Sequence, residues 1–154
     1  MMCRTVRFVN LVLAGMLAGN EFGTWAAVHP SLEKLSPPDR IRAEQEVTRR
    51  FAAIMPAWMG STVVSCVLAL LFSRGSTGSR STLLGTACFV GMLASTRIGN
   101  VPINNRVLEI DPEKDQEEFA ELRERWDRLH TLRVVLNVAG FGFLISGALE
   151  EGHR

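Results

Sequence analysis

The chain has 154 residues, of which 47 % are hydrophobic, and a formal net charge of +1. Lysine and arginine are interleaved with aspartate and glutamate, so no continuous basic face is available and a nucleic-acid partner is not expected. The cysteines Cys3, Cys66 and Cys88 form no closely spaced pair, which argues against a disulfide framework or a thiol redox relay.

The hydrophobic residues are concentrated in four blocks, at about residues 8–28, 51–72, 83–98 and 130–149. A helix needs about 20 apolar residues to cross a hydrocarbon layer of about 30 Å. The blocks therefore predict an all-α integral membrane protein, a four-helix bundle that crosses the lipid bilayer as a single multi-pass domain over residues 1–154.

Two other interpretations of these blocks were weighed. A soluble bundle would need one polar face on each helix, and the stretch "STVVSCVLALLF" has none. The basic and then apolar start of the chain would also suit a cleaved signal peptide. However, the first apolar block continues past Glu21 through "FGTWAAV", which is longer than a signal core and favours a membrane span.

The first two connections carry recognisable boundary signals. Residues 36–39, Ser-Pro-Pro-Asp, are typical of a helix N-terminus and predict a polar helix that leads into the second span. Residues 73–81, "SRGSTGSRS", predict a tight connector before the third span.

The third span is followed by helix-breaking residues. Gly99 and Pro102 are expected to end that helix near the membrane boundary. Asp111 and Pro112 then predict the start of the last helix, which has no stop signal before about Leu149. Its charged first half is expected to form an extended polar helix leading into the fourth span.

Four spans fix which segments share a side of the membrane. Both termini and residues 73–81 fall on one side, while residues 29–50 and 97–133 fall on the other. The long loops contain more basic residues but are equally rich in acids, so the orientation is left open.

Glu21 is unusual because it lies within the first span. An ionisable group at that depth is costly and usually faces a partner, a cavity or the bundle interior. Gly15, Gly19 and Gly23 form a small-residue stripe on which another helix could pack closely, either within the chain or between copies in a homo-oligomer.

Further polar residues converge on the same membrane level. Trp126, His130, Arg133 and Asn137 share one face of the last helix by their spacing. Other polar side chains come from the ends of the first and third spans: His29, Arg97, Asn100, Asn104, Asn105 and Arg106. These groups either satisfy one another, with Glu21 paired to Arg133 or Arg97, or they line a pocket; for the group as a whole, a pocket is favoured.

The residue types in such a pocket suit proton abstraction. His130 or Glu21 would act as base, while Arg133, Arg97 or the asparagine amides would stabilise an oxyanion. A metal site from Glu21, His29 and His130 is conceivable, but no closely spaced ligand pair supports zinc or haem, and no cofactor is expected. Hydrolase, nucleotide-binding and dinucleotide motifs are absent from the sequence.

The segments "GNVPINNRV" and "RWDRLHTLR" resemble the DUF1772 family of small four-span membrane proteins, which includes fungal anthrone oxygenases. The family's first element falls on Asn100, Pro102 and Asn104. Its second element falls on the residues Arg125, Trp126, His130 and Arg133. The "HPSL" at residues 29–32 is also similar to the family's exit from span one.

The resemblance implies oxidation of an anthrone to an anthraquinone by molecular oxygen without a metal or flavin. In that mechanism His130 would be the base, Arg133 with Asn104 and Asn100 would stabilise the anion, and Trp126 would form a wall for a flat ring. Glu21 joins His130 and Arg133 as a candidate catalytic residue, and the other expected pocket residues are Arg97, Asn137 and His29. A non-catalytic protein that binds or transports a small lipophilic molecule is the alternative, and a purely structural membrane protein is a third reading.

Overall fold

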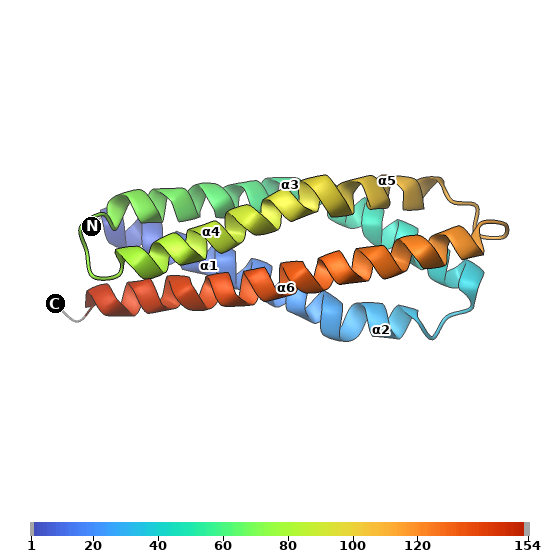
Figure 1. Ribbon diagram of the computed structural model, residues 1–154, viewed down its shortest axis with the longest axis horizontal. Coiled ribbons are helices and arrows are strands. Elements are labelled where there is room, and N and C mark those ends of the chain that lie inside the picture. The colour runs from blue at the N-terminus through green and yellow to red at the C-terminus, as the bar shows by residue number, and fades with distance from the viewer. Residues whose placement is uncertain (1, 153–154) are drawn as a thin grey trace.

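The computed structural model describes the backbone of residues 2–152 as a bundle of long helices without strands in that range (Figure 1). Side chains are described for residues 4–151, so Cys3 lies outside them. The α-helices and two π-helical turns are α1 (Met2–Gly23), η1 (Thr24–Val28), α2 (His29–Leu32), α3 (Pro37–Phe72), α4 (Ser79–Ser95), η2 (Thr96–Asn100), α5 (Val101–Glu109) and α6 (Gln116–Gly152). Because η1 joins α1 to α2 and η2 joins α4 to α5, the chain forms four long rods.

All four rods are long and apolar enough to cross a membrane: Arg4–Leu32, Pro37–Phe72, Ser79–Glu109 and Gln116–Glu151. The four predicted apolar blocks lie within them, which confirms the all-α four-helix bundle and agrees with a multi-pass membrane protein. Large apolar side chains remain exposed along these blocks, among them Phe8, Val64, Leu83 and Val138. Such an apolar outer surface is what a lipid-facing bundle requires.

The order of the rods agrees with the predicted parity (Figure 1). Both ends of the chain and the α3–α4 connection lie at one end of the elongated bundle. The α2–α3 and α5–α6 loops lie at the opposite end, here called the loop end.

The predicted start of α3 is confirmed, whereas α6 begins later than predicted. Ser36 caps α3 by accepting a hydrogen bond from the backbone N–H of Asp39. Asp111 does not cap α6 but holds a preceding turn, because its carboxylate accepts the backbone N–H of Glu113 at 2.9 Å. That hydrogen bond, together with Lys114 nearby, lowers the pKa of the Asp111 carboxyl below its ordinary value.

The expected helix break at Gly99 and Pro102 is wrong, because the third rod continues to Glu109 through the π-helical turn η2. A proline lacks the N–H of a regular helical turn, and its ring clashes with the carbonyl four residues earlier. Widening the preceding turn to π-helix relieves that clash without ending the helix. The first rod repeats the solution, with η1 immediately before His29 and Pro30.

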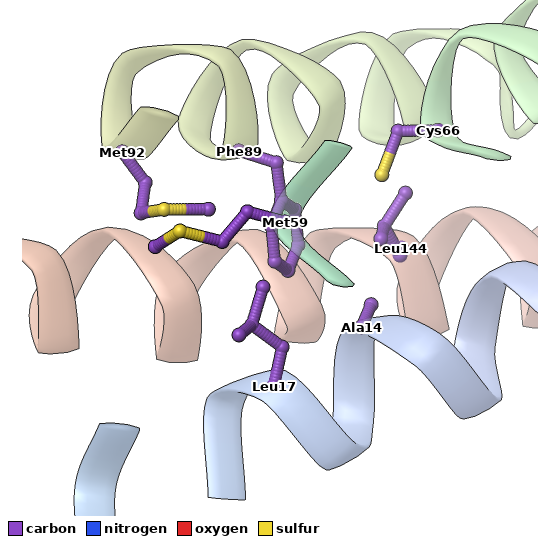
Figure 2. Close-up of a cluster of buried hydrophobic side chains, with 7 residues drawn as sticks. All are labelled: Ala14, Leu17, Met59, Cys66, Phe89, Met92 and Leu144. Atoms are coloured by element: carbon purple, nitrogen blue, oxygen red, sulfur yellow. The ribbon is translucent and has the colours of Figure 1, made fainter. Parts of the chain in front are cut away.

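The bundle has two apolar clusters. One consists of Ala14, Leu17, Met59, Cys66, Phe89, Met92 and Leu144, contributed by all four rods (Figure 2). The other lies at the loop end and consists of Ile41, Ile103, Val107, Ile110 and Phe119.

The closest helix approach uses glycines that the sequence analysis did not single out. A Cβ on Gly78 would come within 2.1 Å of the carbonyl oxygen of Gly147, and one on Gly85 within 2.9 Å of the carbonyl oxygen of Gly140. Gly78, the N-cap of α4, and Gly85 are seven positions apart, as are Gly140 and Gly147 on α6, so the start of α4 and the end of α6 meet backbone to backbone over two turns. These contacts make both helices sensitive to any side chain at the four positions.

The predicted stripe on α1 has a smaller role within the chain. A Cβ on Gly15 would meet the Phe141 ring at 2.9 Å, whereas Gly19 and Gly23 have no neighbour within 4 Å. Gly15 therefore supports packing of α1 on α6, and whether the other two glycines contact a second copy stays a prediction.

Replacement of Gly147 by alanine is expected to lower the free energy of unfolding by about 1–3 kcal/mol, because the new methyl group would overlap Thr82 Oγ1 at 2.6 Å. Gly142→Ala is the matched control, since nothing lies within 4 Å of a Cβ there. Thermal unfolding of the full chain in detergent, followed by circular dichroism, measures both. Equal stability of the two variants would contradict the close α4–α6 contact.

Candidate functional site

A cavity of about 310 Å³ opens inside the loop-end half of the bundle. Its volume is at the lower end of the roughly 300–1,000 Å³ found for small-molecule pockets. Most of its lining is apolar and comes from four helices, including Val47, Phe51, Met55, Met59, Leu93, Val101, Ile103, Leu108 and Leu122. The space therefore suits a small apolar molecule that also meets a few polar groups.

The cavity brings together seven of the nine candidate residues named from the sequence: Glu21, His29, Arg97, Asn104, Trp126, His130 and Arg133. They come from α1, α2, η2, α5 and α6. Asn100 and Asn137 do not line it, so direct contact of these two with a substrate has no support from the cavity lining. A sizeable cavity bordered by Glu21, His130 and Arg133 counts against a purely structural role for the polar group.

Glu21 is paired with Arg133. Its side chain is almost fully buried, and Oε1 accepts a hydrogen bond from Nη2 of Arg133. Its other oxygen lies 3.4 Å from His130 Nδ1, an ion-pair distance without hydrogen-bond geometry. Of the two arginines expected as partners, the structure thus selects Arg133. Arg97 is exposed at the cavity and forms no ion pair with any described residue.

A second carboxylate holds the other buried histidine. Glu44 Oε1 lies 3.1 Å from His29 Nδ1, and Glu44 Oε2 accepts a hydrogen bond from Arg123 Nη1 at 3.1 Å. Arg123 also donates to Asp127. Each of the two buried glutamates therefore pairs with an arginine and lies near one buried histidine, but only His29 is at hydrogen-bond distance from its glutamate.

The indole of Trp126 organises the space between the two histidines. It stacks on the His130 ring with centroids 4.5 Å apart and an interplanar angle of 19°, and it meets His29 edge-on at 4.8 Å. Nε1 of Trp126 donates a hydrogen bond to Asn104 Oδ1 at 2.7 Å. The Arg123 guanidinium lies over the indole ring, with its central carbon 4.0 Å from the ring centroid. These contacts hold the planes of the rings and leave Nε2 of both histidines without a hydrogen-bond partner among the described residues.

Asn100 and Asn137 are completely buried and do not line the cavity. Asn137 donates to the backbone carbonyl of Arg133 at 2.8 Å, which supports the turn of α6 that carries the arginine. Asn100 lies in η2, and neither its amide nitrogen nor its carbonyl oxygen has a hydrogen-bond partner among the described residues. Their positions suit support of the site.

Glu44 and Arg123 were missed by the sequence analysis because both lie in segments rich in charged residues. A signal was present on each helix. Arg123 stands three residues before Trp126 and so extends the face already recognised on α6. Glu44 stands three residues after Ile41, which is fully buried, so the same face of α3 turns inward.

The cavity opens between α3 and the third rod. The exposed lining residues there are Ala52, Pro56, Arg97 and Asn105. Ile54 and Ile98, next to this opening, are exposed apolar side chains typical of a lipid-facing surface. The opening is thus bordered by both apolar and polar groups, as at the boundary of a membrane.

Metal coordination was tested on the described side chains. No group of three or more His, Cys, Asp and Glu within residues 4–151 is placed to hold a metal ion, and this includes the combination of Glu21, His29 and His130 considered from the sequence. The carboxylates of the site are instead engaged by arginines.

Comparison with known proteins gives one result. The sequence model described as anthrone oxygenase matches residues 45–143, which is more than half of the chain. The matched segment includes Asn104, Trp126, His130 and Arg133, whereas Glu21 and His29 precede it. No curated protein and no solved structure matches the chain.

Replacement of Glu21 by glutamine is expected to lower the free energy of unfolding by about 3–5 kcal/mol, because Arg133 would remain buried without a counter-charge. Glu46→Gln is the matched control, since Glu46 pairs with Arg50 at 2.8 Å on an exposed surface and should contribute less than about 1 kcal/mol. Thermal unfolding in detergent measures both. A loss no larger for Glu21→Gln than for the control would show that the buried pair does not stabilise the fold.

Proposed function

This chain belongs to the anthrone oxygenase family, and on that premise we propose that it oxidises a lipophilic, anthrone-like aromatic substrate with molecular oxygen in the cavity. An anthrone carries a methylene group whose proton is acidic because the resulting carbanion is delocalised into the ring and carbonyl. The electron-rich anion then reacts directly with oxygen. The site must therefore supply a base, a stabiliser for the anion and an apolar space.

The observation that carries this proposal is the state of His130. It is buried, it lines the cavity, and neither ring nitrogen has a hydrogen-bond partner among the described residues. A neutral imidazole with a free nitrogen is a suitable general base. We assign removal of the methylene proton to His130. The Trp126 face that stacks on the His130 ring is covered by it, so Trp126 holds this ring in place and can border a substrate only with its remaining surface.

Arg133 and Asn104 are suited to stabilise the anion. Arg133 lines the cavity and keeps Nε without a partner while Nη2 binds Glu21. Asn104 accepts from Trp126 through Oδ1, which orients the amide so that its N–H groups remain available as donors. Asn100 supports this arrangement from behind the wall, and Arg97 would attract a polar end of the substrate at the opening.

His130→Gln is expected to reduce anthrone-dependent oxygen uptake by about 10²–10⁴-fold, because glutamine cannot take up the proton. The full chain in lipid nanodiscs, with empty nanodiscs as the measure of spontaneous oxidation, is the sample. Arg128→Gln, at an exposed position two residues earlier, is the control and should retain the wild-type rate. Full activity of correctly inserted His130→Gln would overturn the assignment of the base.

A second pair of variants tests whether the cavity binds the substrate. Gly60→Leu is expected to raise KM at least tenfold, because Gly60 lines the cavity and a Cβ there has no neighbour within 4 Å, so a side chain would project into free space. Gly19→Leu is the matched control, since Gly19 is equally unobstructed but lies outside the cavity lining. An equal KM for both variants would place the substrate elsewhere.

The alternative is a protein that binds or transports a lipophilic molecule without chemistry. The exposed apolar side chains of Ile54 and Ile98 beside the opening favour access of such a molecule from the bilayer. Saturable binding of an anthrone, weakened by Gly60→Leu, without oxygen uptake above that of empty nanodiscs, would establish this alternative.

A further inference from the structure

The oxidation of an anthrone requires an acid as well as a base. The methylene carbon loses two hydrogens, gains one oxygen atom as a carbonyl, and the second oxygen atom leaves as water. The carbanion first adds oxygen to give a hydroperoxide. In the second stage the remaining C–H bond is broken, its electron pair forms the carbonyl bond, the O–O bond breaks, and the departing hydroxide takes up a proton. A site with a single histidine must use that residue both to remove the carbon proton and to protonate the hydroxide, whereas a second proton donor allows the two transfers to occur together.

His29 is the second buried histidine of the cavity, and its environment differs from that of His130. Its Nδ1 lies at hydrogen-bond distance from a glutamate, 3.1 Å from Glu44 Oε1, whereas His130 Nδ1 is 3.4 Å from Glu21 without hydrogen-bond geometry. Its Nε2 is buried and without a partner among the described residues. In a protonated His29, a carboxylate that accepts the Nδ1 proton stabilises the imidazolium, and the proton on Nε2 is then the one that can be donated.

The two histidines are close enough to act on one substrate atom. Their ring centroids are 5.5 Å apart and their planes are nearly perpendicular, at 79°. Both line the same cavity, and both contact the Trp126 indole. A methylene carbon held at His130 would therefore have the oxygen atoms bound to it within reach of His29.

We propose that His29, held by Glu44, is the general acid that protonates the hydroxide leaving the hydroperoxide, and this proposal rests on the oxygenase function proposed above. His130 removes the first methylene proton and returns it to the peroxide oxygen. His130 then removes the second proton while the O–O bond breaks, and the proton of His29 completes the water molecule. Transfer of the proton from His130 to His29 restores the starting state, so all protons and electrons are accounted for by the substrate and one molecule of oxygen.

Glu44 is a positioning residue in this scheme, because it acts on the substrate only through His29. Its second oxygen is held by Arg123, which fixes the carboxylate relative to α6. Arg123 also binds Asp127, so loss of the Glu44 charge leaves the arginine with a partner. Glu44→Gln can therefore keep an acceptor for His29 Nδ1 and a paired Arg123 in a folded protein.

The two steps can be measured separately on the full chain in nanodiscs. Exchange of the anthrone methylene protons for deuterium under anaerobic conditions reports the base alone. Formation of anthraquinone, compared with oxygen consumed and hydroperoxide recovered, reports the later step. Wild-type protein is expected to show exchange and one anthraquinone for each oxygen consumed.

His29→Gln is expected to retain methylene exchange within about twofold of wild type, while anthraquinone formation falls by about 10²-fold and hydroperoxide accumulates. Glu44→Gln should show a smaller loss with the same accumulation of hydroperoxide, which a merely structural role would not produce. His130→Gln should lose exchange and form neither product.

The proposal is overturned if His29→Gln forms anthraquinone at the wild-type rate, or if exchange and anthraquinone formation fall together without hydroperoxide. Should His29→Gln not fold, Glu44→Gln decides the question by the same two readouts. Absence of both exchange and oxygen uptake in the wild-type protein would instead reject the proposed function itself, so the two failures are distinguishable.

Discussion

The buried contact between Glu21 and Arg133 is the interaction on which the site depends. It connects the first rod to the last. Both side chains are buried, so water cannot take the place of either partner if the other is lost. Removing two charges from water costs several kcal/mol each, and their attraction offsets that cost only when the geometry holds them together. The pair therefore constrains where α1 and α6 can lie relative to each other, and His130, one turn from Arg133 on α6, is placed by the same constraint.

The second glutamate repeats this constraint with different elements. Glu44 on α3 holds His29 from the end of the first rod and Arg123 from α6, so three rods meet at one carboxylate. Two such centres at the loop end fix the polar wall of the cavity. The opposite wall is apolar and is formed largely by α3, where Pro56 interrupts the regular hydrogen bonding. The wall held by the two glutamates thus carries the candidate catalytic groups, and the apolar wall borders the opening.

The four-span architecture was predictable because hydrophobicity over about 20 residues is a strong signal. Glu21 inside the first span was equally informative, because burying a carboxylate in a membrane is unfavourable without a partner. Arg133 was one of the two arginines expected as that partner, and it shares a face of α6 with His130 by its spacing. The charged segments were harder. Glu44 and Arg123 are flanked by residues that remain in solvent, and only the tertiary fold shows that one face of each helix turns inward. The α4–α6 contact was not predicted because its glycines are seven positions apart, whereas the small-residue stripe recognised on α1 has a spacing of four.

The prolines show most clearly why local rules were insufficient. Pro102 was expected to end a helix, yet the chain has enough flanking helix on both sides to absorb the clash in a single wide turn. Pro30 follows the same kind of π-helical turn in the first rod, so the first and third rods each contain one such turn just before a proline. Thr24 and Thr96 begin these turns, each bonding the carbonyl four residues earlier at 2.8 Å, and both line the cavity. A sequence pattern of threonine six residues before proline therefore occurs twice, and in both cases it marks a helix that changes its register beside the cavity.

That change of register has a chemical consequence. A π-turn adds one residue to a helical turn and so rotates all following side chains about the helix axis by roughly 100° relative to a regular α-helix. In the first rod the rotated residue is His29, which thereby reaches Glu44 and the indole of Trp126 while Glu21, before the turn, still faces Arg133. In a regular helix, residues eight apart, such as Glu21 and His29, would lie about 80° apart around the axis. The π-turn between them changes this angle, and both residues line the same cavity. The prolines that look like breaks in the sequence thus allow one helix to contribute both a buried counter-charge and a histidine to a single site.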